Sequence, residues 1–176
     1  LIVTSPPYVT SYNYADIHQL SILWLGYASD HRALRKNMLG NQYGVELPES
    51  VKKDSLGQPA NTAYRDLLRK DPYKADSVAR YFLDMDKAVA KCEHMLNYGG
   101  MAVFVIGNTE YRGIRIDNAK HLEESMKRAG FLDIHAIPRK VSSKTLTPYR
   151  DARGRFTRDS TQRKVYGQEF VVIGRK

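Results

Sequence analysis

The sequence predicts a mixed α/β fold, and two patterns carry that prediction. Apolar runs of strand length occur at residues 1–3, 101–106, 131–137 and 165–174. Between them lie segments whose apolar residues recur every three or four positions, which is the spacing of one helix face. Strands that alternate with helices in this way form a sheet on which the helices pack. A chain of 176 residues is long enough for one such domain.

The first strand, residues 1–3, leads into a polar, tyrosine-rich loop, and a helix is expected after it. Its apolar side chains recur at helical spacing at Ile17, Leu20, Trp24 and Tyr27. On this pattern Trp24 belongs to the core rather than to a base-stacking site. Asp30 is expected to cap a short second helix that runs toward Met38.

The middle of the chain contains a long loop and the strongest helix. Residues 40–61 lack periodicity and are rich in glycine and proline, so we predict a mobile loop there. A short helix is expected at residues 62–68. The helix that begins at Asp71-Pro72 has a regular apolar stripe at Val78, Phe82, Met85, Val89, Cys92 and Leu96. Gly99 and Gly100 should end it.

The second half should complete the sheet. Residues 101–106 are continuously apolar, as expected for a parallel strand covered on both faces. Asp117 or Asn118 can cap a helix that ends at Gly130. No helix separates the last two strands, residues 131–137 and 165–174, so they should pair antiparallel.

Thr4-Ser5-Pro6-Pro7-Tyr8, which follows the first strand, is the most specific pattern in the chain. The Ser5 hydroxyl and the Pro6 carbonyl offer two hydrogen-bond acceptors. The prolines fix their φ angles and carry no N–H, so the backbone is stiff. Tyr8 adds a flat face for stacking. Two acceptors beside an aromatic ring suit a planar amino group, although a rigid turn would also explain the prolines.

This segment resembles the catalytic motif of the amino-methylating DNA methyltransferases, (Asp/Asn/Ser)-Pro-Pro-(Tyr/Phe). The form with Ser5 is most similar to the N4-cytosine members, although some N6-adenine enzymes share it. Residues 96–108 resemble the next helix end and strand of that fold, and residues 169–176 resemble its closing strand. The likeness spans most of the chain, but only the five-residue motif is specific.

The resemblance implies a Rossmann-like, S-adenosylmethionine-dependent methyltransferase fold, here incomplete, with one catalytic domain over residues 1–176. The substrate would be an exocyclic amino group, N4 of cytosine ahead of N6 of adenine, on a base rotated out of double-stranded DNA. The residues it implies are Ser5, Pro6, Pro7 and Tyr8 for catalysis and Thr4 and Ser5 for the cofactor.

The family's glycine-rich Phe-x-Gly-x-Gly loop, which holds S-adenosylmethionine, has no counterpart in this sequence. The chain also begins at Leu1, almost inside a strand. We therefore expect a missing N-terminal part, or a partner chain, to carry that loop. Two alternatives stay open: a non-catalytic nucleic-acid-binding fragment, and a methyltransferase of the same fold acting on RNA or on a protein amide. The latter usually has Asp or Asn in place of Ser5.

Positive charge is concentrated near the end of the chain. The net charge is +9, but residues 1–138 hold 17 Lys/Arg and 16 Asp/Glu, whereas residues 139–176 hold 11 and 3. This segregation is typical of a polyanion-binding surface, and a solvated loop is the alternative. We predict a basic loop over residues 139–164. Its expected phosphate contacts are Arg150, Arg153, Arg155 and Arg158, and Tyr149 and Phe156 either stack on a base or pack the loop onto the domain.

Other kinds of site have little support. Cys92 is the only cysteine, so no internal disulfide can form, and its place on an apolar helix stripe predicts a packed thiol. The five histidines show no metal-ligand spacing, so no metal is expected. No glycine-rich phosphate loop suggests nucleotide hydrolysis. No apolar run approaches the ~20 residues of a membrane span, and we expect a cytoplasmic protein.

Overall fold

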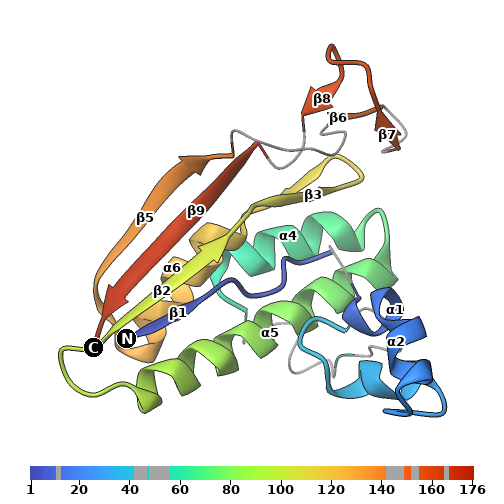
Figure 1. Cartoon of the computed structure of the whole chain (residues 1–176). Helices are drawn as coiled ribbons and strands as arrows, with labels where there is room; N and C mark the ends of the chain where they lie inside the picture. Colours follow the sequence, from blue (N-terminus) through green and yellow to red (C-terminus); the bar gives the residue numbers. More distant parts are fainter. Residues whose placement is uncertain (11–12, 42–46, 48–55, 142–148, 152–154, 165–166) are drawn as a thin grey trace.

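The computed structural model describes residues 1–10, 13–41, 47, 56–141, 149–151, 155–164 and 167–176. Its centre is a four-stranded sheet in the order β1-β2-β9-β5 (Figure 1). The strands are β1 (Ile2–Thr4), β2 (Met101–Ile106), β9 (Gln168–Arg175) and β5 (Leu132–Lys140). β1 and β2 are parallel, and β9 runs antiparallel to both of its neighbours. The fold is therefore mixed α/β, and the predicted antiparallel pairing of the last two strands is confirmed.

Three helices lie together on one face of this sheet (Figure 1). They are α4 (Gln58–Leu68), α5 (Pro72–Met95) and α6 (Asn118–Ala129). The predicted cap at Asp117 is confirmed, because its carboxylate accepts a bond from Lys120 N. The predicted start of α5 at Asp71-Pro72 is also confirmed, and there the Asp71 carboxylate accepts a bond from Lys74 N. Gly130 ends α6 with a φ of 98°, a left-handed conformation that glycine adopts without strain.

The core lies between the helices and the sheet face that they cover. The apolar stripe predicted on α5 is buried there at Val78, Phe82, Met85 and Val89. Cys92 is half-buried beside it, and burial raises the pKa of its thiol. From the sheet, Phe104 and Val172 reach the same core, so the helix stripe and alternate strand residues form one packed unit.

The expectation that residues 101–106 are covered on both faces is wrong for the described part of the chain. Ala102, Phe104 and Ile106 are buried, whereas Met101 is 38% exposed and the alternate positions are only half-buried. On the same uncovered face, Val3 of β1 is 64% exposed. A continuous apolar run gave no indication of which face the helices would leave open.

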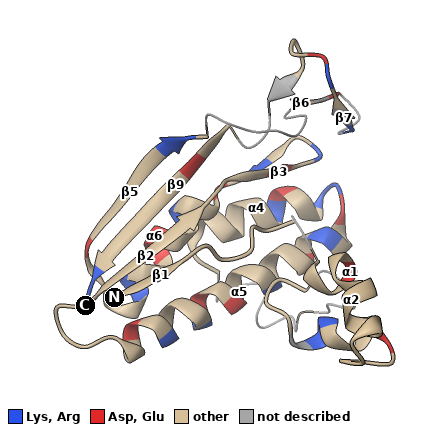
Figure 2. Cartoon of the chain, viewed as in Figure 1, with Lys and Arg blue, Asp and Glu red and all other residues tan. Residues whose placement is uncertain are grey.

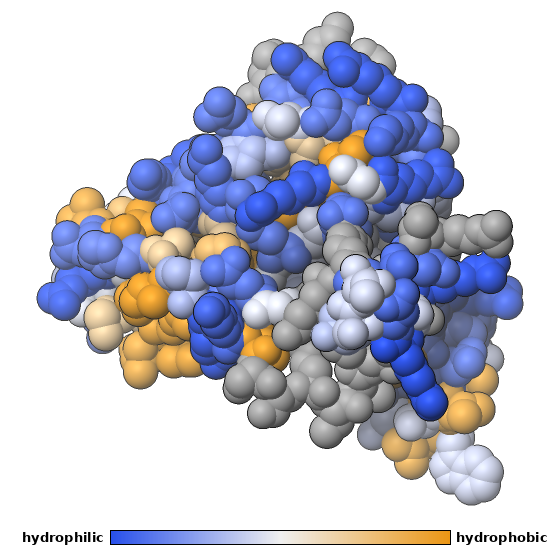
Figure 3. Space-filling view, turned by 90° about the horizontal axis from the view of Figure 1, so that it is seen from above, coloured by the Kyte–Doolittle hydropathy of each residue, from blue (hydrophilic) through white to orange (hydrophobic). Residues whose placement is uncertain are grey.

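The first predicted helix is broken into two short pieces, α1 (Tyr14–Ile17) and α2 (Gln19–Trp24), and the predicted second helix is the 3-10 helix η1 (His31–Asn37). Asp30 does cap the last of these, accepting a bond from Arg32 N. Trp24, expected in the core, is 89% exposed, so that prediction is wrong. Figure 3 shows a small group of hydrophobic residues at its lower right, the side where α1 and α2 lie in Figure 1, and a larger group on its left.

The predicted loop over residues 40–61 is shorter than expected, because α4 already begins at Gln58. Residues 42–46 and 48–55 of that loop lie outside the described residues. A hairpin of β3 (Thr109–Tyr111) and β4 (Ile114–Ile116) was not predicted. It turns through Arg112 and Gly113, both with positive φ, and the sequence signal for it was this Arg-Gly pair.

The predicted basic loop over residues 139–164 contains regular structure. Arg139 and Lys140 belong to β5, and a small sheet in the order β7-β6-β8 follows them. Its strands are β6 (Tyr149–Arg150), β7 (Phe156–Thr157) and β8 (Arg163–Lys164), and they extend away from the central sheet (Figure 1). Within the described ranges, no helix is long and apolar enough to cross a membrane.

Candidate functional site

The Ser-Pro-Pro-Tyr segment lies where two parallel strands end together. Residues 5–8 follow the carboxyl end of β1, and residues 107–108 follow the carboxyl end of its partner β2. Ligands of open α/β sheets bind beyond such ends. Ser5 is exposed, and Pro6 and Pro7 are half-buried. The tip of the motif is therefore open to solvent at the edge of the sheet where the strands terminate.

The Ser5 hydroxyl is oriented by the neighbouring strand. Its Oγ donates to the carbonyl oxygen of Val105 on β2, at 3.0 Å. Because that bond uses the hydroxyl proton, the lone pairs of Oγ remain to accept hydrogen bonds from a ligand. A serine held in this way presents an acceptor, which suits an amino group.

The two motif carbonyls differ in their partners. Tyr81 of α5 is only 2% exposed, and its hydroxyl donates to Pro7 O at 2.8 Å. Burial raises the pKa of Tyr81 far above its ordinary value, so the phenol keeps its proton and remains a donor. In the part of the chain that the structure describes, no donor bonds to Pro6 O. The Pro6 carbonyl is therefore the acceptor of the pair that a ligand can use.

The Tyr8 ring is held at both ends. One side of the ring lies against Gly107, where an added Cβ would be 2.8 Å from Tyr8 Cε2. Its hydroxyl donates to Oε1 of Glu169 on β9, at 3.0 Å. Burial, together with the bond to Glu169 and its negative charge, raises the pKa of Tyr8 to about 12. Tyr8 is therefore a neutral, half-buried aromatic at the side of the motif.

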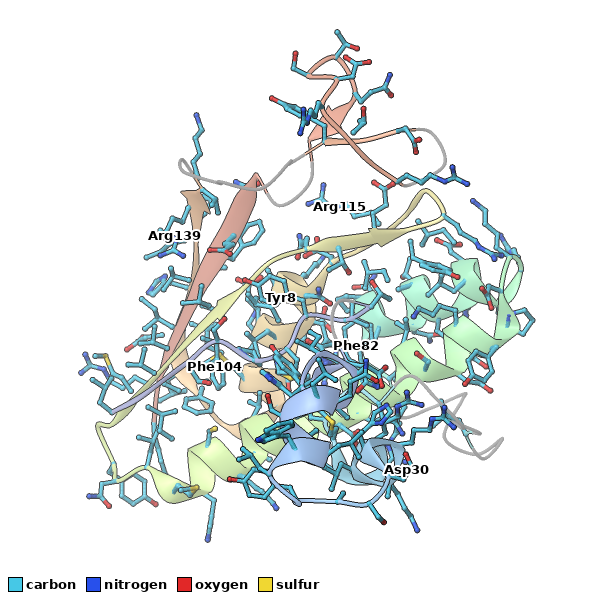
Figure 4. The ribbon with its side chains drawn as sticks, turned by 45° about the vertical axis from the view of Figure 1, so that its right-hand side comes forward. Tyr8, Asp30, Phe82, Phe104, Arg115 and Arg139 are labelled. Atoms are coloured by element: carbon cyan, nitrogen blue, oxygen red, sulfur yellow. The ribbon has the colours of Figure 1, made fainter. Side chains whose placement is uncertain are left out.

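Glu169 is in turn bound by Arg139 of β5. Arg139 Nη2 donates to Glu169 Oε2 at 2.6 Å, and the two residues are directly paired across β5 and β9. Figure 2 shows the basic end of β5 beside an acidic residue on β9. Figure 4 shows Arg139 at the end of the outer strand and Tyr8 on the segment after β1. Two strands and the segment after β1 thus contribute to one polar network beside the motif.

Asn108 lies after β2, at the same edge of the sheet as the motif, but its side chain serves the fold. Its side-chain amide donates to Asp117 Oδ1, and its oxygen accepts from Ala119 N, both at 3.0 Å. Asn118, 1% exposed, donates to Gly107 O at 2.8 Å. These bonds join the end of β2 to the start of α6, and so they fix the backbone on which the Tyr8 ring rests.

The basic residues predicted to contact phosphate are only partly described. Arg155 and Arg158 are exposed, and Tyr149 is half-buried. Arg153 lies outside the described residues. For Arg150 and Phe156 the backbone is described, within β6 and β7, but the side chains are not. The described arginines thus face solvent at the end of a sheet that extends from the domain.

The two residues that the resemblance assigns to the cofactor lie at the end of β1. Thr4 is the last residue of β1 and Ser5 follows it, both are exposed, and β1 has a partner on one side only among the described residues. Both side chains are therefore accessible from solvent at this edge of the sheet. The described residues contain no group of three or more His, Cys, Asp or Glu side chains arranged to hold a metal ion.

Three residues of the site were not anticipated from the sequence. Tyr81 lies next to the apolar stripe of α5, and this position predicts a core residue. The sequence therefore gives no indication of its bond to Pro7 O. Glu169 is the one acidic residue at the start of an apolar strand, and that contrast is a usable signal. Gly107 follows a buried strand directly, and glycine there marks a close approach, here of the Tyr8 ring.

Comparison with known proteins gives weak matches. No family model matches the chain. The sequence is 23% identical to the Type II methyltransferase M.MvaI of Kocuria varians in an alignment of 154 residues that covers 83% of this chain and 34% of that protein. The chain therefore spans about a third of the length of this relative. The crystal structure of a candidate DNA modification methylase from Thermus thermophilus aligns with 55% of this chain and 36% of its own, with a TM-score of 0.38 and 15% identity.

Proposed function

We propose that this chain is a catalytic part of a DNA methyltransferase that modifies an exocyclic amino group, N4 of cytosine in preference to N6 of adenine. The observation that carries the proposal is the exposed Ser5 hydroxyl beside an unengaged Pro6 carbonyl, at the carboxyl ends of β1 and β2 in the described part of the chain. The sequence similarity to a Type II methyltransferase supports it. The choice of base rests on serine, rather than aspartate, at position 5.

The two acceptors would make the exocyclic amine a better nucleophile. An exocyclic amine is a weak nucleophile because its lone pair is delocalised into the ring. Ser5 Oγ and Pro6 O, each accepting one N–H, would favour a pyramidal nitrogen with its lone pair free. The same oxygens would stabilise the positive charge that develops as the new N–C bond forms. Tyr81 contributes indirectly, because its bond to Pro7 O stiffens the backbone that carries Pro6.

The remaining requirements are alignment and loss of a proton. S-adenosylmethionine, when bound beside Thr4 and Ser5, would supply an electrophilic methyl group: the N–C bond forms as the methyl–sulfur bond breaks, its electron pair stays on sulfur, and S-adenosylhomocysteine leaves. The motif would hold the amine nitrogen toward that methyl group, which would lower the entropic part of the barrier. The alkylated nitrogen is acidic and releases one proton, so no strong base is needed in the chain.

Tyr8 would hold the base itself. A base inside a duplex must be rotated out before its amine can reach Ser5, and an aromatic ring can stack on the extruded base. The Tyr8 ring is half-buried and fixed against Gly107, which suits a stacking platform. Arg155 and Arg158 are exposed for contact with DNA phosphates.

The direct test is transfer of a labelled methyl group from S-adenosylmethionine to DNA by the intact protein. We expect Ser5→Ala to lower the rate by about 100-fold, the usual effect of removing one group that stabilises developing charge. Ser29, in another region of the chain, supplies the control Ser29→Ala, which should keep the full rate. An unchanged rate in Ser5→Ala, with both variants folded, would defeat the assignment.

A further inference from the structure

A chain of polar contacts links the outer strand of the sheet to the motif. Arg139 donates to Oε2 of Glu169, and Oε1 of the same carboxylate accepts the Tyr8 hydroxyl. Each oxygen of Glu169 therefore has a different partner, one from β5 and one from the segment after β1. This division fixes the plane of the carboxylate and, through it, the position of the Tyr8 hydroxyl.

The burial of Glu169 and Arg139 indicates which of the two side chains depends more on its partners. The Glu169 side chain is 18% exposed, whereas the Arg139 side chain is 57% exposed. A charged group that is largely out of water needs good partners, and Glu169 has a cation and a hydroxyl. Arg139 is the more replaceable member, because its ion pair is partly screened by solvent.

The Tyr8 ring has only one polar atom, and that atom is bound to Glu169. The backbone of Gly107 restrains one side of the ring. The ring also packs against the core, and the Ser5 side chain lies close enough to the hydroxyl to act on its pKa, but the bond to Glu169 is the one that takes the hydroxyl proton. Loss of that bond should therefore let the ring leave the orientation that it has beside Ser5.

We propose that Glu169 is a positioning residue for Tyr8, and that Arg139 supports it by holding its second oxygen. This inference rests on the proposed function, because positioning matters only if Tyr8 receives a base. Glu169 touches neither the base nor the reacting atoms; it acts through the tyrosine. The effect is therefore on turnover rather than on the affinity for DNA.

The test is a double-mutant cycle in the intact protein, read as the single-turnover rate of methyl transfer to DNA at saturating cofactor and DNA. Glu169→Ala and Tyr8→Phe should each lower the rate about tenfold, because each removes the same hydrogen bond to a charged group. The double variant should also be slower by about tenfold, whereas independent effects would give about 100-fold. Glu169→Gln keeps an acceptor oxygen and should retain most of the rate.

Two further readouts distinguish positioning from a general loss of structure. The dissociation constant for DNA should be unchanged in Glu169→Ala, and the control Asp66→Ala, which removes an exposed carboxylate from α4, should keep the full rate. In protein labelled with carbon-13 at tyrosine Cζ, the Tyr8 signal, identified by its loss in Tyr8→Phe, should titrate at lower pH in Glu169→Ala than in the wild type.

Some results would overturn only the role of Glu169, and others would overturn the proposed function as well. An active wild type whose two variants are additive, or whose Tyr8 titration is unaffected by Glu169→Ala, overturns the inference alone. A wild type that transfers no methyl group to DNA overturns the proposed function and this inference together.

Discussion

The ring of Tyr8 occupies the space that a side chain at Gly107 would fill. An added Cβ at Gly107 would lie 2.8 Å from Cε2 and 3.3 Å from Cδ2 of that ring, closer than such atoms normally approach. The segment after β1 and the end of β2 are therefore interlocked. The motif gains its rigidity from this contact as well as from its prolines.

Gly107→Ala should displace the Tyr8 ring and lower the free energy of unfolding by about 1–3 kcal/mol, the usual cost of overpacking. The measurement is urea denaturation of the intact protein. In a Tyr8→Ala background the ring is absent, so the same glycine substitution should cost much less. Equal costs in the two backgrounds would show that the contact is not the reason for glycine here.

Tyr81→Phe should lower the free energy of unfolding by about 1 kcal/mol, because it leaves the half-buried Pro7 carbonyl without its donor. Urea denaturation measures this loss. Tyr98→Phe is the matched control, since Tyr98 is 94% exposed and should show no change. A loss of stability of the same size in both variants would argue against a specific role for the Tyr81 hydroxyl.

The raised pKa of Tyr8 predicts a loss of stability in alkaline solution. The folded state holds the Tyr8 proton up to a pKa of about 12, whereas the unfolded chain releases it near the ordinary value of 10.0. Stability from this group is therefore complete below the unfolded value and is lost as the pH rises through that window. Denaturation of wild type and Tyr8→Phe across the lower half of the window should show the steeper decline in the wild type. Parallel declines would contradict the burial and bonding assigned to Tyr8.

Binding of DNA should weaken steeply with salt if the exposed arginines bind phosphates. Replacing Arg155 and Arg158 by alanine should reduce the slope of log K against log salt by about 0.9 for each phosphate that is no longer neutralised. Arg175→Ala is the control, because Arg175 is exposed at the opposite end of β9, paired with Met101. A flat salt dependence in the wild type, or an equal effect of Arg175→Ala, would count against a phosphate surface here.

Local signals predicted the elements whose ends are fixed by their own residues. The Asp71 and Asp117 caps and the Gly130 stop are decided within one helical turn, so the sequence was sufficient for α5 and α6. Trp24 shows the limit of periodicity: its helical spacing is compatible with a core position, but the pattern does not say whether another surface covers that face. Only the tertiary packing decides this.

The sequence likewise predicted only part of the candidate site. The place of residues 5–8 at a strand end followed from the apolar run before them and from the motif itself. The partners that orient the motif come from 74 and 161 residues away along the chain, as Tyr81 bonds to Pro7 and Tyr8 bonds to Glu169. No local pattern predicts contacts over such separations, because they depend on the order of the strands in the sheet.

The proposed function requires that Ser5 and the Pro6 carbonyl hold a nucleobase amine for methylation. Mass spectrometry of nucleosides, from the DNA of cells expressing the intact gene, tests it most directly. We expect N4-methylcytosine, or in second place N6-methyladenine, in cells with the wild-type gene and its absence in cells with Ser5→Ala. Neither modified base in the wild type, or equal amounts with Ser5→Ala, would contradict it.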